Sequence, residues 1–388
     1  MTLKLGISRS YMHVTRTIHP IGQGAFYTER IECDNRVYNV VYDCGSNFRK
    51  NASAILKREI ASYYANHDVI DILFISHFDN DHINGIDELR KRTSKIKNIV
   101  VPLIEKKDFW FYEIENEGFQ SFYNSLSRYA DRVYKIIPAQ ENDENANNYQ
   151  LNDVRIIDFS EVQDGKKDIS EVQNATRFLF GGHVDWCYIP FNYDQKERLE
   201  KLKCELVKLG ISVAVLESGW DSIIPCLDEI KKAYKNILPD GANKTSLIVY
   251  SGGLSSEYDC TQYQGKLYIL YRRYYSTSRR EGCLYFGDND LNQPNILVDL
   301  RNKLRYVVNR VATIQVPHHG ALKNFNRDLF TVGEEITFFL SFGNKNTYGH
   351  PSVRVVEDIL WSGNALIEVT ENRDSAYIQI IKKRSASK

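Results

Sequence analysis

The stretch ILFISHFDNDHING, residues 72–85, decides the fold and the chemistry that we expect of this 388-residue chain. The apolar run Val69–Ile75 has the length of one buried strand. Four imidazole and carboxylate side chains follow it at close spacing: His77, Asp79, Asp81 and His82. Alternation places the first three on one side of an extended segment, with the fourth at the turn behind them. Such groups repel one another or stay unsatisfied without a cation, so the spacing predicts ligands for one or two divalent metals rather than a merely polar loop.

Other strand-like runs also end in polar groups, at positions far apart in the sequence: Asp43, Asp288, His318, His319 and His350. Histidines that only fill a core would not fall repeatedly at strand ends. One site assembled from several strand termini explains the pattern with a single cause. Two of the runs, Ala25–Cys33 and Val37–Asp43, are joined by Asp34–Arg36, which predicts a β-hairpin. Apolar spacing predicts a helix over residues 51–66.

Composition is ordinary for a soluble globular protein, with 43% hydrophobic and 26% charged residues. Fifty basic residues balance fifty acidic ones, so no global field recruits nucleic acid or membrane, and a nucleic-acid substrate needs a local basic groove. The seven cysteines form no CxxC pair, which favours reduced thiols in the cytosol. The chain shows no apolar run of transmembrane length and no signal-peptide core at its start, so we expect a cytoplasmic protein without a membrane partner.

We expect one domain over residues 1–388, interrupted at residues 104–240 by a mostly helical insertion that matches no known family. Leucines on one face predict a helix over Gln195–Leu209, and a second helix is expected over Asp221–Ile237. An aromatic cluster, which is more often core than a base-stacking platform, precedes them. The insertion is expected to pack beside the site and to wall one side of it, with substrate contact left open.

Seven motifs carry a resemblance to a known family: IGQGAF (21–26), VVYDCG (40–45), SHFDNDHING (76–85), KTSLIV (244–249), YFGDND (285–290), VPHHG (316–320) and SFGNKNTYGHP (341–351). In order and approximate spacing they resemble the metallo-β-lactamase-like superfamily. Within it, they resemble the hydrolase domain of ComEC-type competence proteins and its stand-alone relatives. The resemblance implies an α/β fold, an αββα sandwich with the metal site at one edge between its two sheets.

The resemblance also implies roles for the candidate ligands. His77 and Asp79 would bind a first metal, Asp81 and His82 a second, and Asp288 would bridge both. His319 or His350 would complete the second site, and His318 is a further candidate ligand. The candidate catalytic residues are Asp81, Asp288, His319 and His350.

Two departures from the family pattern concern the first metal. Asp79 stands where the usual HxHxDH motif has histidine. A carboxylate is a harder ligand than an imidazole, so the site admits manganese as well as zinc, with iron as a third choice. The usual histidine before the SLIV-like strand is missing, and Ala242–Lys244 stand there. His183 is the upstream substitute, and we interpret it as structural rather than as a ligand.

Bound metals would generate a bridging hydroxide near neutral pH, which predicts a metal-dependent hydrolase. Carboxylate-rich ligands and the competence-type resemblance favour a phosphodiesterase or nuclease, with nucleic acid or a nucleotide as substrate. Weak candidates for substrate contact are Lys323, Asn344 and Asn346. A basic stretch is interpreted as a solvated hairpin tip that permits nucleic-acid contact: Arg272, Arg273, Arg279 and Arg280. The alternatives are hydrolysis of a thioester, lactone, β-lactam or other small ester or amide, and a non-catalytic binding or scaffold protein with a vestigial site.

Overall fold

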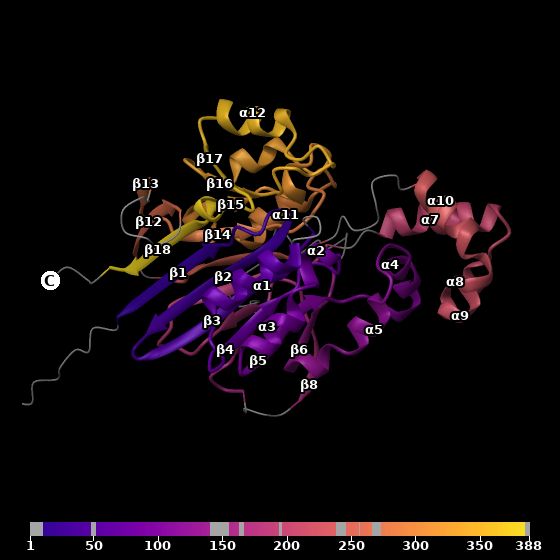
Figure 1. The fold of residues 1–388 in the computed structure, drawn as a ribbon, viewed down its shortest axis with the longest axis horizontal. Helices are drawn as coiled ribbons and strands as arrows, with labels where there is room; N and C mark the ends of the chain where they lie inside the picture. The colour runs from indigo at the N-terminus through magenta and orange to yellow at the C-terminus, as the bar shows by residue number, and fades with distance from the viewer. Residues whose placement is uncertain are drawn as a thin grey trace, which may run out of the picture.

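The computed structural model describes residues 11–47, 52–139, 155–162, 167–193, 196–237, 246–255, 257–265 and 273–384. Two β-sheets pack face to face, and helices lie against their outer faces (Figure 1). This arrangement confirms the predicted α/β sandwich of four layers. Among the described residues, every helix is too short or too polar to cross a lipid bilayer.

The larger sheet has ten strands within the described residues, in the spatial order β13 (Arg273–Ser278), β12 (Tyr258–Gln264), β18 (Tyr377–Lys383), β1 (Met12–Ile18), β2 (Gly24–Cys33), β3 (Arg36–Ser46), β4 (Val69–Phe74), β5 (Lys95–Pro102), β6 (Ala130–Ile136) and β8 (Asp168–Val172). From β3 to β8 neighbouring strands are parallel. The predicted hairpin is confirmed between β2 and β3, where Asp34 and Asn35 take φ angles of 46° and 66°. Positive φ at both positions is what a tight two-residue hairpin turn needs.

The smaller sheet has eight strands within the same residues, in the order β17 (Ala365–Val369), β16 (Thr337–Ser341), β15 (Val311–Gln315), β14 (Gly282–Tyr285), β11 (Ile248–Gly253), β10 (Trp186–Phe191), β9 (Arg177–Leu179) and β7 (Ile156–Asp158). Strands β14 to β17 are parallel. Because parallel strands end at the same edge of a sheet, the loops after β14, β15 and β16 emerge together. The parallel part of the larger sheet does the same for the loop after β4.

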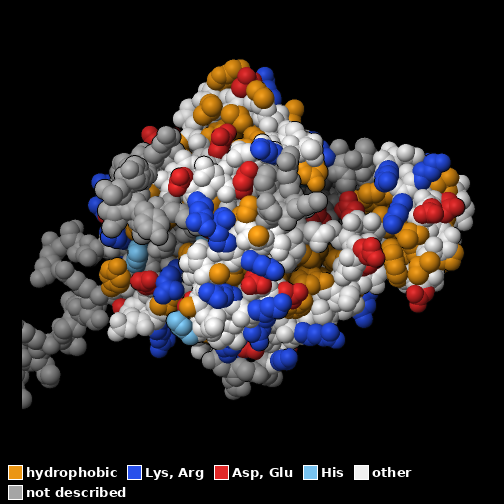
Figure 2. Space-filling view, in the orientation of Figure 1, with side chains coloured by type: hydrophobic (Ala, Val, Ile, Leu, Met, Phe, Trp, Pro, Cys, Tyr) orange, Lys and Arg blue, Asp and Glu red, His pale blue; other side chains and the backbone are white. Residues whose placement is uncertain are grey.

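Three apolar layers hold the sandwich together. Between the sheets, Phe74 and Val249 belong to one buried cluster with strands from both sides. Helix α1 (Ala52–Tyr63), which confirms the helix predicted over 51–66, packs with α3 (Ile86–Arg92) against the outer face of the larger sheet. Helices α11 (Ile296–Lys303) and α12 (Val353–Trp361) cover the outer face of the smaller sheet. Figure 2 shows basic side chains spread among acidic ones over the face that α1 and α3 cover.

Among the described residues of 104–240, helix outweighs strand as predicted, but the segment is not the separate insertion that we expected. Strands β6 and β8 extend the larger sheet, and β7, β9 and β10 extend the smaller one, so this segment is part of both sheets. The strand β10 shows why the prediction was wrong: WCYIPF is buried at every position, so it has no alternating pattern to reveal it. The predicted helix over Asp221–Ile237 is also divided, because Pro225 lies in a 3₁₀ turn between α9 (Trp220–Ile223) and α10 (Leu227–Ile237).

The helices of this segment form two groups. Helices α4 (Phe109–Glu115), α5 (Phe119–Asn124) and α6 (Leu126–Tyr129) precede β6. Helices α7 (Lys196–Lys208), α8 (Val213–Glu217), α9 and α10 form a unit that we call the helical lobe, residues 196–237. The lobe lies to one side of the sheets, next to α4 (Figure 1). It buries its apolar faces against Trp110 and Phe111 of α4 rather than against the sandwich.

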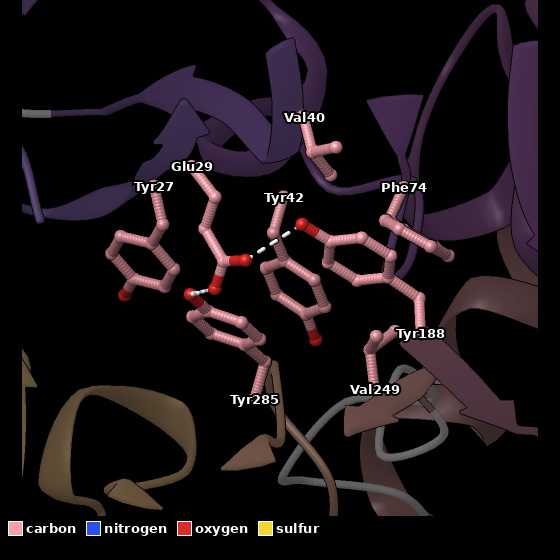
Figure 3. Close-up of a pocket in the computed structure, with 8 residues that line it drawn as sticks. All are labelled: Tyr27, Glu29, Val40, Tyr42, Phe74, Tyr188, Val249 and Tyr285. Carbon is pink, nitrogen blue, oxygen red and sulfur yellow. Dashed lines mark hydrogen bonds between the residues drawn. The ribbon is translucent and has the colours of Figure 1, made fainter. Parts of the chain in front are cut away.

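A buried ion pair lies between the two sheets. Arg16 Nε donates to Glu29 Oε1 at 2.6 Å, and both side chains are buried. Figure 3 shows the hydroxyl groups of Tyr188 and Tyr285 pointing at the Glu29 carboxylate, at 2.7 and 2.8 Å. Ser251 Oγ adds a third donor at 2.6 Å. We call these five residues the core ion-pair network.

Candidate metal centre

Two glycines let the ligand loop lie directly on the larger sheet. After β4 the chain runs through His77 to the short helix α2 (Asn80–Ile83). A Cβ atom at Gly45 of β3 would lie 2.4 Å from the backbone of Asp81 and of His82, and one at Gly24 would lie 2.7 Å from Asp81 O. Real Cβ atoms do not approach backbone so closely, so glycine at both positions is required for this close packing. The loop is thereby held against β2 and β3.

The smaller sheet delivers the remaining ligands at the same edge. Asp288 follows β14 after Gly287, which has a φ of 54°. His318 and His319 follow β15, and both take left-handed φ angles, 47° and 52°. Such angles cost a non-glycine residue free energy and persist where the surrounding structure imposes them. Leu247 N donates to Ser76 O at 2.8 Å, which ties the ligand loop of one sheet to the other sheet.

The ligand atoms of five residues converge in two overlapping groups. His77, His82 and Asp288 present ligand atoms that all lie within 4.8 Å of one another, and so do Asp81, His82 and His319. The two carboxylate oxygens of Asp288 lie near different histidines: Oδ1 lies 3.4 Å from His82 Nε2, and Oδ2 lies 3.8 Å from His77 Nε2. His318 Nε2 lies 3.5 Å from the same Oδ2 atom. The two oxygens therefore face different histidines, as a carboxylate that bridges two cations would.

Several of these atoms are buried and make no hydrogen bond within the described part of the chain: His77 Nε2, His82 Nε2, His319 Nε2 and Asp288 Oδ1. Each such orphaned group costs about 1–3 kcal/mol. Four of them at one place indicate a shared missing partner. Imidazole nitrogen and carboxylate oxygen are both ligands of zinc and manganese, so the donor set fits one or two divalent metals.

In each histidine of the cluster, the second ring nitrogen, Nδ1, lies within hydrogen-bonding distance of an oxygen atom. The Nδ1 distances are 2.8 Å from His82 to Asp43 Oδ2, 2.8 Å from His319 to Ser341 O, 2.9 Å from His318 to Asn324 Oδ1, and 2.9 and 3.1 Å from His77 to Ser76 Oγ and Ser246 Oγ. An acceptor at Nδ1 fixes the tautomer and leaves Nε2 free as the ligand atom. This repeated arrangement is typical of histidines that bind metal.

Asp43 has a role that sequence reasoning did not assign. Besides contacting His82, its carboxylate accepts from Ser76 N and from Ser76 Oγ, both at 2.6 Å. It is fully buried and takes a left-handed φ of 56°. Its position at the end of a strand-like run was visible in the sequence, but its function is to hold His82 rather than to contribute a ligand.

Asp79 is the most exposed carboxylate of the cluster, at 32%. Its Oδ2 atom lies 3.5 Å from His77 Nε2. Its Oδ1 atom accepts a hydrogen bond of 2.6 Å from Asn116 Nδ2, at the end of α4. Sequence reasoning missed Asn116, because an asparagine in a loop 37 positions away carries no signal of this contact.

The charges of the cluster shift its own protonation equilibria. Burial alone would raise the pKa of Asp288, but the positive charges of His318, His82 and His77 outweigh it and hold that pKa well below its usual value. Burial would also raise the pKa of Asp81, but the nearby imidazoles of His319 and His82 outweigh it and lower that pKa to about 2. Burial would lower the pKa of His82, yet Asp288 and Asp43 raise it well above its usual value. In the metal-free cluster, the carboxylates therefore stabilise protonated histidines, and the histidines stabilise ionised carboxylates.

His350 belongs to the cleft but to neither ligand group. Its ring centroid lies 5.5 Å from that of His318, and its Nδ1 atom is buried without a hydrogen bond among the described residues. Burial and the charges of His318 and His319 lower its pKa to about 4. In this geometry His319, rather than His350, completes the second group with Asp81 and His82.

The three predicted substrate contacts have different surroundings. Asn346 is engaged by its own loop, since Nδ2 donates to His350 O at 2.5 Å and Oδ1 accepts from His350 N at 3.2 Å. Asn344 is exposed, and its backbone N–H donates to Glu371 at 3.0 Å. Lys323 is half-buried, and its charge contributes to lowering the pKa of His350.

Other sequence-based interpretations concern residues away from the cluster. His183 is exposed, its Nε2 lies 3.1 Å from Tyr38 Oη, and it belongs to neither ligand group. Arg280 contacts the carbonyl of Val311 at 3.4 Å. Arg272 and the segment Ala242–Lys244 lie outside the described residues, as does the side chain of Arg273.

A cleft of about 230 Å³ opens over the cluster. Its lining combines ligands with carboxamides and one tyrosine: Gln23, Asn47, Asp79, Asn80, Asp81, Asn116, Asp288, His318, His319, Tyr348 and His350. The candidate ligands among these residues are thus accessible to a small molecule from solvent.

Comparison with known proteins identifies a family for part of the chain. Residues 35–160 match the family model of the metallo-beta-lactamase superfamily. Among solved structures, the metallo-beta-lactamase fold protein YhfI from Bacillus subtilis is similar, with 8% identity, coverage of 93% of this chain and 98% of that chain, and a TM-score of 0.38. Among curated proteins, none matches this sequence significantly. The family match over residues 35–160, together with the two-sheet sandwich and its ligand motif, shows that this chain carries a metallo-beta-lactamase superfamily domain, the fold of metal-dependent hydrolases.

Proposed function

We propose that this protein is a phosphodiesterase that binds two divalent metals and acts on a nucleotide or on short nucleic acid. The observation that carries the proposal is the orientation of the Asp288 carboxylate, whose two oxygens face different histidines at 3.4 and 3.8 Å. A carboxylate so placed suits two cations side by side. Two-metal sites are common among enzymes that hydrolyse phosphate esters, where they stabilise both the attacking and the leaving oxygen.

The residues divide between two sites. His77, Asp79 and His318 would hold the first metal, Asp81, His82 and His319 the second, and Asp288 both. In this division His318 supplies the imidazole that the family pattern places before the SLIV-like strand. Three carboxylates among the ligands favour a hard metal such as manganese, and the histidines also suit zinc. When bound, the metals supply an activated water and accept negative charge from phosphoryl oxygens.

The protein itself orients these ligands and shapes the cleft. Asp43, Asn324 and the Ser341 carbonyl hold histidine rings in place, so little reorganisation is needed when metal binds. His350 is neutral at pH 7, because its pKa is lowered to about 4, and it lines the cleft. It can therefore exchange a hydrogen bond with a substrate. Lys323 adds a positive charge near this position, which favours an anionic substrate.

The test compares hydrolysis of bis-p-nitrophenyl phosphate, nitrocefin and a p-nitrophenyl-type thioester, each with the metal-free protein and with added MnCl2 or ZnCl2. His319→Ala and His183→Ala form a matched pair, because one removes a cluster histidine and the other a surface histidine. We expect metal-dependent cleavage of the phosphodiester, lost in His319→Ala and kept in His183→Ala. Faster turnover of nitrocefin or of the thioester would replace the proposal with the corresponding amide or ester hydrolase. Binding of metal without turnover of any substrate would favour a non-catalytic role.

A further inference from the structure

We propose that Asn116 is a positioning residue for the first metal: it fixes Asp79 as a ligand and links that metal to the packing of the helical lobe. This inference rests on the proposed metal site and is independent of which substrate is hydrolysed. Its starting observation is the 2.6 Å hydrogen bond that Asn116 Nδ2 donates to Asp79 Oδ1.

The cluster histidines and Asp79 are each held by a hydrogen-bonding group of the kind that they need: an acceptor for a histidine and a donor for a carboxylate. A histidine that binds through Nε2 has an N–H group at Nδ1 to donate, and each cluster histidine has an oxygen there. A carboxylate that binds through one oxygen has a second oxygen that accepts. Asp79 is supported by a donor, the amide of Asn116. The support at Asp79 therefore follows the same rule as the supports of the histidines, with the polarity reversed as a carboxylate requires.

Asp79 needs such a support more than its neighbours do. Its side chain is 32% exposed, whereas those of His77 and Asp288 are 2% and 6% exposed. A partly exposed carboxylate is restrained less by packing than a buried one, and ordering it costs conformational entropy. A hydrogen bond from a fixed donor removes part of that cost before the metal arrives.

Asn116 is itself held in place. It ends α4, where its N–H donates to Tyr112 O at 2.9 Å and its carbonyl accepts from Phe119 N at 2.9 Å. The turn behind it is closed by Glu113, whose carboxylate accepts from Gly118 N at 2.6 Å and from Gln120 N at 2.8 Å. Gly118 has a φ of 90°, which suits glycine. The amide thus projects from a backbone that is fixed on both sides.

The helix that carries Asn116 is anchored in the helical lobe. Trp110 and Phe111 are buried with Leu202, Leu206 and Tyr234 of the lobe. At the start of α4, Lys203 of the lobe pairs with Asp108 at 3.4 Å, and it also pairs with Glu217 at 3.1 Å. At its end, the hydroxyl group of Tyr234 donates to Glu115, next to Asn116. One helix therefore connects the lobe to a metal ligand, so the lobe contributes to the site through position although it supplies no ligand.

The experiment measures metal binding rather than turnover. Metal-free wild type, Asn116→Ala and Asn124→Ala are titrated with MnCl2 by isothermal calorimetry, and coupling between the two Mn²⁺ ions is followed by electron paramagnetic resonance. Asn124 is the matched control, because it is an exposed asparagine at the end of the neighbouring helix α5. We expect one of the two binding steps to weaken by about 10–100-fold in Asn116→Ala, with the other step unchanged and the coupled signal reduced.

Further outcomes separate this inference from the proposed activity. Asp43→Asn, which acts on His82, should weaken the other step, so the effects of the two substitutions should add in the double variant. Wild-type affinity for both ions in Asn116→Ala would overturn the inference, as would an equal loss in Asn124→Ala. Tight binding of two ions without phosphodiester hydrolysis would refute the proposed activity alone. Circular dichroism of the metal-free variants checks that both fold.

Discussion

Two groups of buried charged residues are held in this sandwich, and they differ in how far they satisfy one another. In the core ion-pair network, Glu29 accepts from Arg16, Tyr188, Tyr285 and Ser251. Arg16 also donates to Gln379 at 2.6 Å and to the Glu281 carbonyl at 3.1 Å. In the metal cluster, by contrast, buried nitrogen and oxygen atoms point at one another without hydrogen bonds among the described residues.

The difference teaches how to tell structural from functional charge in a buried position. A buried charge is tolerated when partners within the chain satisfy it, and the core ion-pair network is complete in this sense. In the metal cluster, the Nδ1 atom of each histidine contacts an oxygen atom, whereas the Nε2 atoms of His77, His82 and His319 make no hydrogen bond among the described residues. Histidines fixed through Nδ1 whose Nε2 atoms lack hydrogen bonds indicate a ligand-binding site. Each prediction below perturbs one of the two regions.

The largest effect is expected at Asp288. Asp288→Asn keeps the size of the side chain but removes the charge that faces both histidine groups, and an amide bridges cations poorly. Phosphodiesterase activity with saturating metal should fall by about 10⁴-fold, the scale seen when a catalytic unit is broken. Steady-state kinetics with Asp290→Asn as the control would check this, since Asp290 lies two positions away outside both ligand groups. Activity close to wild type would show that Asp288 does not bridge metals.

The next effect concerns the core ion-pair network. Glu29→Ala leaves Arg16 buried without its partner, which should lower the free energy of unfolding by about 3–5 kcal/mol. Glu32→Ala on the same strand removes the partly exposed ion pair with Arg30 and should change stability by less than about 1 kcal/mol. Denaturant titration measures both. Metal stoichiometry of folded Glu29→Ala should equal that of wild type, and a lost metal would show that the two regions are not independent.

A smaller effect is expected from the support of His82. Asp43→Asn offers one acceptor oxygen where Ser76 N, Ser76 Oγ and His82 Nδ1 now share two. Metal affinity should fall by about 10–100-fold while the fold is kept. Calorimetric titration measures it, with Asp131→Asn, which removes a surface partner of Lys95, as the control. Unchanged affinity would mean that His82 is positioned without Asp43.

The smallest effect is the pH dependence of metal binding. Neighbouring carboxylates raise the pKa of His82 and of His319 against the effect of burial, so both histidines bind protons more readily in the metal-free protein than an ordinary histidine does. Metal must displace these protons, and the apparent affinity should rise by up to about tenfold per pH unit for each proton released. Calorimetry in two buffers of different ionisation enthalpy counts the protons. Binding without proton release would contradict the assignment of these nitrogens as ligands.

The same shifts predict a stability optimum for the metal-free protein. His319 has a raised folded pKa, so its contribution is complete below the unfolded value of 6.5 and is lost as pH rises through the folded value. Asp81 has a folded pKa of about 2, so its contribution is present above the unfolded value of 3.8 and is lost as pH falls toward 2. The cluster therefore stabilises the metal-free fold most between pH 3.8 and 6.5. Thermal unfolding of wild type and His319→Gln should differ most in that window.

Much of the fold and of the site was predictable from local patterns. The apolar run before His77 identified β4, and ligands spaced along one segment or placed at strand ends were visible as a pattern. The family resemblance placed Asp288 and His319 with them, and the family match over residues 35–160 and the two-sheet architecture confirm the superfamily. The closer resemblance to ComEC-type hydrolases stays a prediction.

What was not predictable depends on contacts between distant segments. Asn116 and Asn324 support ligands from loops whose sequence shows nothing unusual. Strand β10 is buried on both faces and so lacks the alternation that would have revealed it, which led to the wrong prediction for residues 104–240. The Arg16–Glu29 pair joins adjacent strands, but its burial follows from the opposing sheet rather than from its own neighbours.

The central claim is that the orphaned atoms of the cluster are the ligands of two cations. The most direct test is to titrate chelator-treated protein with MnCl2 or ZnCl2 and to determine bound metal by elemental analysis after desalting. The account predicts about two equivalents per chain for wild type. It predicts fewer for His319→Ala, and the wild-type value for His183→Ala. Failure of the wild-type protein to retain either metal would contradict it.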